Sequence, residues 1–270
     1  MKPLTLTLKI RPEQRVDMSP LSCHLIKDKT PAEIAAIKLN SGTRKLKVEK
    51  LFNIKGQDTQ HIIIEQSHPK LDFIGKDLQG GQIKVEGHAG AYLGIGMQSG
   101  TIKVTGDAAI FAGCEMKNGL LQIDGNAGDF VGGALPGNKK GIQGGMLLVK
   151  GNVGERAGDH MRRGVLLIEG NTGDYCASRM TAGTIAVLGS VGRYLGYGMR
   201  RGTLVLWQMP EIGPTFNDCG SHTLAFLPML FASFRHLNSS FADPSNAFDR
   251  VKRYGGDMGE MGRGELLIKA

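Results

Sequence analysis

The chain has 270 residues, of which 41% are hydrophobic and 21% charged, so it is too apolar for a disordered protein and long enough for one long domain or two short ones. Its 40 glycines are about twice the ordinary usage, yet no G-X-Y period runs through the sequence, which excludes collagen. A formal net charge of +8 favours an acidic partner, whether a polyanionic ligand, nucleic acid or an acidic subunit, and does not choose among them.

The sequence predicts a soluble, cytoplasmic protein. The first residues, Met1-Lys-Pro-Leu-Thr-Leu, alternate instead of forming the apolar run of a signal peptide. No apolar stretch approaches the roughly 20 residues of a membrane-spanning helix, so we expect no membrane contact. The four cysteines are scattered without a CxxC pair, which favours four buried thiols over a disulfide framework: Cys23, Cys114, Cys176 and Cys219.

Residues 1–60 are predicted to form a small mixed α/β cap. Leu4, Leu6, Leu8 and Ile10 alternate as in a strand. The segment Thr30-Pro-Ala-Glu33 is a capping box with proline at the first helical position, and it predicts a short helix through Ile37. A second strand-like stretch runs from Leu46 to Ile54.

Residues 61–207 carry a nineteen-residue glycine repeat, which indicates one stacked unit per period. The leading glycines, interrupted once by the seven-residue insertion Leu135-Pro-Gly-Asn-Lys-Lys-Gly141, are Gly81, Gly100, Gly119, Gly145, Gly164, Gly183 and Gly202. Glycine suits sharp corners because it reaches positive φ and allows close approach of backbones.

Three apolar points recur in each period. Two and four residues after the leading glycine lie the pairs Ile83/Val85, Ile102/Val104, Leu121/Ile123, Leu147/Val149, Leu166/Ile168, Ile185/Val187 and Leu204/Leu206, as in a strand facing a core. A second point falls at Tyr92-Leu93, Phe111, Phe130-Val131, Tyr175-Cys176 and Tyr194-Leu195. A third, interpreted as stacked core side chains and not metal ligands, comprises Leu78, Met97, Met116, Ile142, Met161, Met180 and Met199.

Residues 208–270 leave the repeat and are predicted to close its end with a helix and a final coil. Pro210 and Pro214 interrupt the pattern, and the apolar stretch from His222 to Leu237 favours a helix that Pro228 kinks or restarts. Met261, Gly264 and the pair Leu266/Ile268 then repeat the spacing of one more coil.

These elements predict a mainly β fold: a right-handed parallel β-helix with coils of about 19 residues, a small mixed N-terminal cap and a helical C-terminal cap. The right-handed winding follows from the handedness of parallel crossovers. The end elements are expected because a stack of coils otherwise exposes unpaired strand edges.

No autonomous catalytic or metal site is predicted on this chain. The stretch Gly132 to Lys139 comes nearest to a phosphate-binding loop, but asparagine stands where lysine is required. The seven histidines show no metal-ligand spacing, and no nucleophile lies in a recognisable triad. The register of Asp107, Asn126, Asn152 and Asn171 favours a structural ladder at a corner.

Basic residues gather just before the leading glycines and are the candidate binding site. Two interpretations stay open, a solvated edge that blocks edge-to-edge association and a cationic track for a polyanion or an acidic partner. The candidate residues are Lys117, Lys139, Lys140, Arg162, Arg163, Arg200, Arg201 and Arg263, with Arg156, Arg179 and Arg193 expected nearby.

The repeat GGxIxVxGxxGxxxGxxMxxG, as it stands from Gly80 to Gly100, resembles the GXGXG domain family. That family includes a domain of the glutamate synthase large subunit and the C subunit of formylmethanofuran dehydrogenases. A chain of this length with short caps looks most like the latter. The tail Pro214-Thr-Phe-Asn-Asp-Cys-Gly220 looks like the bacterial branch, found in the formyltransferase/hydrolase complexes of methylotrophs.

The resemblance implies a structural subunit of one-carbon metabolism. In such complexes a formyl group passes from formyl-tetrahydromethanopterin to a methanofuran-type carrier and is released as formate, with metals and active sites in the hydrolase-like A and B subunits and the formyltransferase D subunit. No cofactor and no nucleic acid is then expected on this chain. The polyglutamate tail of the carrier would suit the basic edge. The alternatives are the C subunit of a molybdenum or tungsten formylmethanofuran dehydrogenase and a free-standing polyanion-binding module.

Overall fold

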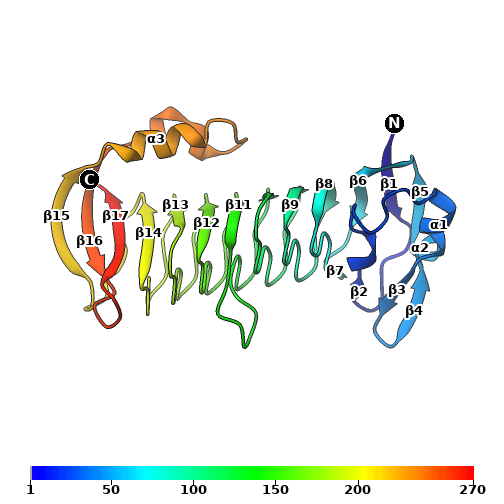
Figure 1. The fold of residues 1–270 in the computed structure, drawn as a ribbon, viewed down its shortest axis with the longest axis horizontal. Helices are drawn as coiled ribbons and strands as arrows, with labels where there is room; N and C mark the ends of the chain where they lie inside the picture. The colour runs from blue at the N-terminus through cyan, green and yellow to red at the C-terminus, as the bar shows by residue number, and fades with distance from the viewer. Residues whose placement is uncertain (1) are drawn as a thin grey trace.

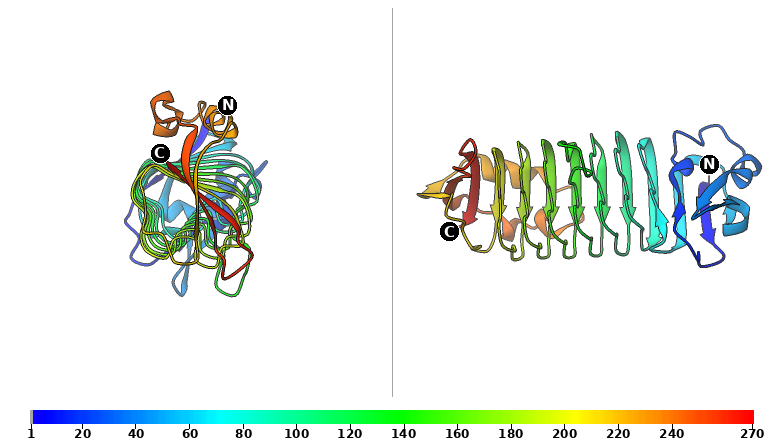
Figure 2. Two further views of the ribbon diagram at one scale, coloured as in Figure 1. Left: turned by 90° about the vertical axis from the view of Figure 1, so that its left-hand side faces the viewer. Right: turned by 90° about the horizontal axis from the view of Figure 1, so that it is seen from below.

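Thirteen strands form one long sheet in the computed structural model, which describes residues 2–270 (Figure 1). The sheet order is β15-β16-β17-β14-β13-β12-β11-β10-β9-β8-β6-β1-β5, and neighbouring strands from β1 and β6 through β14 to β17 are parallel. The protein is therefore mainly β and built around a mostly parallel sheet, consistent with a β-helix-like fold. Figure 2 shows the repeats stacked along the rod and superposed when the rod is viewed from its end.

The repeated strands align residue by residue in steps of the glycine period. Ile83, Ile102, Leu121 and Leu147 are successive partners along the sheet. The strands are β6 (Asp58–Ser67), β8 (Gln79–Gly87), β9 (Ser99–Val104), β10 (Leu120–Ile123), β11 (Gln143–Val149), β12 (Arg163–Ile168), β13 (Thr184–Val187), β14 (Arg201–Leu206) and β17 (Arg263–Lys269). Because the register is maintained across the insertion, the inward-facing side chains stack on those of the next repeat.

The predicted apolar pairs and the methionine column are confirmed as the core. Every member of the seven pairs is at most 2% exposed, and Leu78, Met97, Met116, Ile142, Met161, Met180 and Met199 are all fully buried. One continuous cluster runs from Leu4 to Ile268. Burial of this row stabilises the rod by about 25 cal/mol per Å² of apolar surface removed from water.

The second apolar point is corrected in one respect, because its aromatic rings lie outside this continuous cluster; Phe111 is buried in a separate, smaller one with Ile95 and Cys114. Phe111 adopts φ 62°, and Tyr92, Phe130, Tyr175 and Tyr194 are likewise in the left-handed region. That conformation turns the ring outward and the next residue inward. The inward residues are Leu93, Ala112, Val131, Cys176 and Leu195, each at most 4% exposed.

The N-terminal cap continues the sheet with β1 (Pro3–Leu8), parallel to β6, and β5 (Phe52–Lys55), antiparallel to β1. A second sheet contains β2 (Val16–Asp17), β3 (Lys38–Ser41), β4 (Arg44–Lys47) and β7 (Leu71–Asp72), and a 3₁₀ turn spans Ser19–Leu21. The capping box is confirmed, and its helix α1 spans Pro31–Ala36.

Two N-terminal predictions were too long. The first strand ends at Leu8, so Ile10 lies outside it and is 63% exposed. The stretch from Leu46 to Ile54 is interrupted by helix α2 (Val48–Leu51), which buries Val48 and Leu51 together.

The C-terminal helix is also shorter than predicted. Residues 217–223 form strand β15 (Asn217–Thr223), which pairs with β16 (Arg250–Gly256), and α3 spans only Phe226–Ser233. Pro228 lies in the first turn, where its missing N–H costs no intrahelical bond. The final coil is confirmed for Leu266 and Ile268, but Met261 is 52% exposed because residues 257–262 form a projecting loop.

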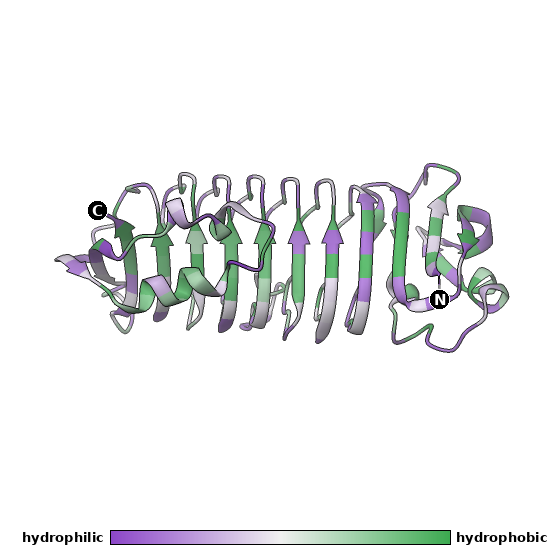
Figure 3. Cartoon of the chain, turned by 90° about the horizontal axis from the view of Figure 1, so that it is seen from above, coloured by the Kyte–Doolittle hydropathy of each residue, from purple (hydrophilic) through white to green (hydrophobic). Residues whose placement is uncertain are grey.

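The C-terminal segment packs along the outer face of the sheet (Figure 3). The residue between each inward pair points outward; it is Lys84, Lys103 and Gln122 in the first repeats and Leu148, Leu167, Ala186 and Val205 in the later ones. The later four are fully buried against Leu227, Phe231, Phe234 and Phe241, in a segment that also contains 3₁₀ turns at Ser240–Ala242 and Pro244–Asn246. No helix among residues 2–270 is long and apolar enough to cross a membrane.

Candidate functional site

The candidate basic edge lies at the corner where each repeat enters its strand. Arg163, Arg201 and Arg263 are the first residues of β12, β14 and β17, and Arg201 and Arg263 are direct partners in the parallel ladder. Lys117 and Arg162 occupy equivalent positions, since each donates its backbone N–H to the core residue one repeat earlier, Met97 and Ile142. The predicted lysines and arginines therefore lie along one line, which Thr181 and Ala182 interrupt.

The insertion extends this line outward. Residues 136–140 are all exposed, and the loop projects from the rod near β11 (Figure 1). The loop is held at both sides: Glu115 Oε1 accepts from Asn138 Nδ2 at 2.6 Å and from the Leu135 N–H at 3.2 Å, and the Lys139 carbonyl accepts from Arg162 Nε at 3.3 Å. The ammonium groups of Lys139 and Lys140 stay free to meet a ligand, next to Arg162.

Most charges of the edge have no carboxylate partner. Within residues 2–270, Arg200 is the one member of the predicted set that forms a salt bridge, to Glu260 at 3.0 Å. The other seven are exposed without one. Like charges in a row are mutually unfavourable, so an incoming anion would relieve repulsion as well as gain attraction.

Two further groups lie next to the edge: His160, which was not predicted there, and Arg179, which was expected nearby. His160 lies in the repeat beside Arg179, and its pKa is lowered by burial, with the positive charges of Arg179, Lys139 and Arg162 adding to the effect despite the opposing charge of Asp159. Arg179 itself is held by the buried Asp159 through two bonds, of 2.9 and 2.7 Å. The sequence contains a signal for His160, because the pair Asp159-His160 has no counterpart at the same position of the other repeats.

Arg156 and Arg193 belong to a different column from the basic edge. The Arg156 guanidinium lies 4.5 Å from the Tyr175 ring and 6.0 Å from the Phe130 ring, in the position that an aromatic residue occupies in the neighbouring repeats. Arg193 pairs with Asp174 at 3.0 Å. Arg156 thereby continues the aromatic stack on the side of the rod, and Arg193 is held beside that stack by Asp174.

The corner ladder predicted from Asp107, Asn126, Asn152 and Asn171 is confirmed in register, but each side chain bonds the next repeat. Its Oδ1 accepts the backbone N–H nineteen residues on, or twenty-six across the insertion, at 2.8 Å. A second ladder was missed: Asp129 accepts from the backbone N–H of Glu155, and Asp174 from that of Arg193. Both ladders hold neighbouring repeats together, and the side-chain oxygens that form them are already engaged in hydrogen bonds.

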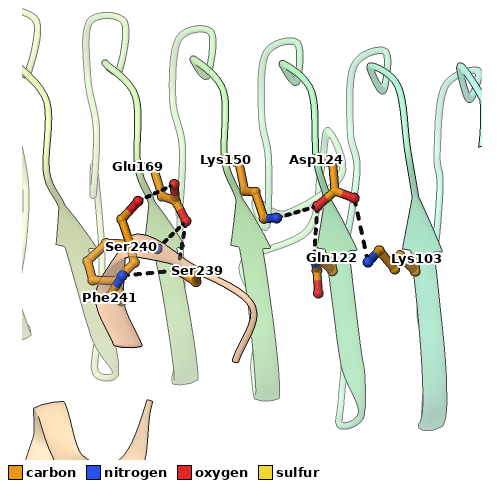
Figure 4. Close-up of polar contacts among 8 residues, drawn as sticks. All are labelled: Lys103, Gln122, Asp124, Lys150, Glu169, Ser239, Ser240 and Phe241. Atoms are coloured by element: carbon orange, nitrogen blue, oxygen red, sulfur yellow. Dashed lines mark hydrogen bonds and ion pairs between the residues drawn. The ribbon is translucent and has the colours of Figure 1, made fainter. Parts of the chain in front are cut away.

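Polar contacts on the outer sheet face also have structural partners (Figure 4). Glu169 accepts from the hydroxyls of Ser239 and Ser240 at 2.7 and 2.8 Å, which fastens the C-terminal segment to the rod. Asp124 lies between Lys150 at 3.0 Å and Lys103 at 3.7 Å. Both carboxylates on this face thus have partners within the chain, in contrast to the unpaired charges at the corner.

The cysteines divide three to one, which corrects the prediction of four buried thiols. Cys23, Cys114 and Cys176 are buried, and Cys219 is exposed on β15. Burial raises the pKa of Cys23 to about 11 and that of Cys176 to about 12. In the part of the chain that the structure describes, no group of three or more His, Cys, Asp or Glu residues could hold a metal ion.

Comparisons with a family model, a curated protein and a solved structure agree with one another. The model of the GXGXG motif family matches residues 40–218. The C subunit of the formyltransferase/hydrolase complex Fhc of Methylorubrum extorquens strain AM1 is 43% identical over 266 residues, which is 98% of this chain and 99% of that protein. A chain in the X-ray crystal structure of the formyltransferase/hydrolase complex FhcABCD from Methylorubrum extorquens, in complex with methylofuran, superposes with a TM-score of 0.92 at 38% identity, covering 98% of this chain and 99% of that one.

Proposed function

Because this chain belongs to the GXGXG motif family and to the C-subunit group within it, we propose that it is the structural, non-catalytic C subunit of a formyltransferase/hydrolase complex. The observation that carries the proposal is full-length similarity, both in sequence and in fold, to a component of such a complex. The partners are then the hydrolase-like A and B subunits and the formyltransferase D subunit. Together they convert formyl-tetrahydromethanopterin to formate through a methanofuran-type carrier.

The proposed shape is a right-handed parallel β-helix with coils of about 19 residues. The strand register supports it, since Leu166, Ile185 and Leu204 are successive partners. The right hand follows from the twist of strands joined by parallel crossovers. Such a rod is stiff along its axis and offers long flanks, which suits a scaffold that holds other subunits in place.

The metals and the carrier-modifying sites are proposed to lie on the other subunits. On this chain the buried carboxylate and thiols of the rod are already engaged in packing. The Asp159 carboxylate binds Ser178 Oγ at 2.6 Å and Arg179, and the Cys114 and Cys176 thiols are buried in the rod. Their role is to hold adjacent repeats together.

The basic edge is proposed to bind the polyglutamate tail of the carrier. A row of guanidinium groups spaced along stacked strands matches a flexible chain of carboxylates, and its attraction is screened by salt. Seven of its eight members have no carboxylate partner within the described chain. This pairing would keep the carrier close to the complex between two reactions.

Co-expression with the A, B and D subunits tests the assembly, and the tagged chain is expected to recover all three. The edge is tested by replacing Arg162, Arg163, Arg200 and Arg201 with glutamine in the assembled complex. We expect carrier affinity at low salt to fall roughly tenfold, with a smaller difference at high salt. The matched control neutralises four exposed lysines of the N-terminal cap, Lys29, Lys38, Lys45 and Lys55. Equal affinity of the arginine variant, the control and the unaltered complex would refute the role of the edge.

A further inference from the structure

An apolar patch is exposed at the C-terminal end of the rod. Its members are two tyrosines and two methionines: Tyr194 is 53% exposed, Tyr197 60%, Met258 47% and Met261 52%. We call these four residues the end patch. Exposed large apolar groups that gather in one place typically mark a binding surface, whereas single ones are ordinary.

Backbone contacts join the two halves of the patch. The N–H of Gly198, directly after Tyr197, donates to Asp257 Oδ2 at 3.0 Å, and the Asp257 N–H donates to the Met199 carbonyl at 3.2 Å. The loop of residues 257–262 is thereby fixed beside Tyr197, with Met258 and Met261 on it. Figure 2 shows this loop leaving the rod at the same corner as the insertion.

Tyr194 and Tyr197 are held in place from within the rod. Tyr194 stacks on Tyr175 at a centroid distance of 4.7 Å, and Tyr197 forms a T-shaped pair with the same ring at 6.0 Å. Rigid aromatic anchors lose little conformational entropy when a partner covers them. The patch therefore combines fixed rings with adaptable methionine side chains, a composition typical of protein interfaces.

On another face of the rod, the chain covers an apolar row with its own residues. Along the outer sheet face, the apolar row from Leu148 to Val205 is fully buried beneath the α3 segment. The end patch has no such cover. A partner molecule would cover the end patch in the way that the α3 segment covers the outer sheet face.

We propose that the end patch docks another subunit of the same complex, through a surface with an apolar centre and an acidic rim. This inference rests on the proposed function. Four arginines adjoin the patch along the chain: Arg193 precedes Tyr194, Arg200 and Arg201 follow Tyr197, and Arg263 follows the loop of residues 257–262. Two of them have carboxylate partners, Arg193 with Asp174 and Arg200 with Glu260. The surplus of positive charge complements carboxylates on the partner and repels a second copy of this chain, whose net charge is +8.

The test uses the tagged full-length chain co-expressed with the A, B and D subunits. The patch variant is Tyr197→Ser/Met258→Ser/Met261→Ser, and the matched control is Phe226→Ser/Met229→Ser on α3, where the two side chains are 44% and 75% exposed. Recovered subunits are identified and quantified by mass spectrometry. We expect the patch variant to recover at least one of them about tenfold less efficiently, and the control to behave as the unaltered chain. Arg201→Glu/Arg263→Glu is expected to reduce the same recovery, most strongly at low salt.

The outcomes separate the two proposals. If the unaltered chain recovers none of the three subunits, the proposed function fails and this inference with it. If it recovers them and the patch variant does so equally well, only the docking role is overturned. It is also overturned if the unaltered chain alone forms a dimer that the patch variant breaks. Thermal unfolding of each variant as an isolated chain, expected to be unchanged because the replaced groups are exposed, separates impaired docking from impaired folding.

Discussion

At the scale of single residues, glycine meets two different needs in this rod, and only one of them involves the neighbouring repeat. Gly145 has φ 77°, and a Cβ there would lie 2.6 Å from the Gly119 carbonyl oxygen. Gly137, in the insertion, has φ 88° with nothing within 4 Å of its Cβ position. Positive φ alone strains an alanine, whereas a clash with backbone also forces two repeats apart.

We therefore expect Gly137→Ala to cost about 1 kcal/mol of unfolding free energy and Gly145→Ala about 3 kcal/mol or more. Urea unfolding of both variants measures the difference, and each serves as the control for the other because both positions are left-handed. Equal midpoints would contradict the role assigned to close approach.

The thiols make a second residue-scale prediction. Burial raises the pKa of Cys23 to about 11 and that of Cys176 to about 12, so the folded chain keeps their protons to higher pH than the unfolded chain does. The stabilisation that comes from keeping these thiols neutral is complete below about pH 9 and is lost as the pH rises toward 11 and 12.

The same burial predicts how the thiols react. At pH 8 a thiol reagent should modify one cysteine in the folded protein and four in denaturant, and Cys219→Ser should abolish the reaction of the folded protein. Two or more fast thiols in the folded state would contradict this burial.

At the scale of elements, the outward residue of each strand decides where the C-terminal segment can pack. Leu167 is fully buried beneath it, whereas Gln122 holds the same register position in β10, beyond the covered strands in Figure 3. Leu167→Lys places an unpaired charge in an apolar contact and should destabilise the packed segment by about 3 kcal/mol or more. Limited proteolysis should then cleave within residues 224–249, and Gln122→Lys should leave that segment resistant. Resistance of both variants would show that the segment does not depend on this row.

The sequence predicted the inward side of these elements better than the outward side. A period of two identifies Ile102 and Val104 as core from their spacing alone, but it cannot tell that Phe111 turns outward, because the reversal depends on a left-handed backbone. His222 was placed in a helix by its apolar neighbours, although pairing with Val251 holds it in a strand. Propensity acts locally, and a strand is decided by its partner.

The candidate site divides in the same way. The basic residues were predicted from their position before each glycine, and the repeat places them on one corner without further information. The end patch was not predicted, because it joins Tyr197 to a loop some sixty residues later in the chain, and Met261 fitted the core pattern by spacing. Contacts between the repeat and its cap follow from the fold of the whole chain and have no periodic signal.

At the scale of the whole molecule, the insertion should be removable without changing the rod. The step from Ala134 to Ile142 then corresponds to the step from His160 to Met161 in the next repeat, and the spacing from Gly119 to Gly145 returns to nineteen. Removal breaks the surface hydrogen bonds that the loop makes with Glu115 and Arg162, and shortening a loop changes its closure entropy only slightly.

Deletion of residues 135–141 should therefore change the unfolding free energy by no more than about 1 kcal/mol, measured by urea unfolding. Deletion of the seven residues 154–160 should instead prevent folding, because it removes the core residue Ala157 and breaks the register. The loop deletion also removes Lys139 and Lys140 while keeping the arginines, so carrier affinity of the assembled complex should fall by less than in the arginine variant. A chain that unfolds without the loop would show that the insertion holds the two halves of the rod in register.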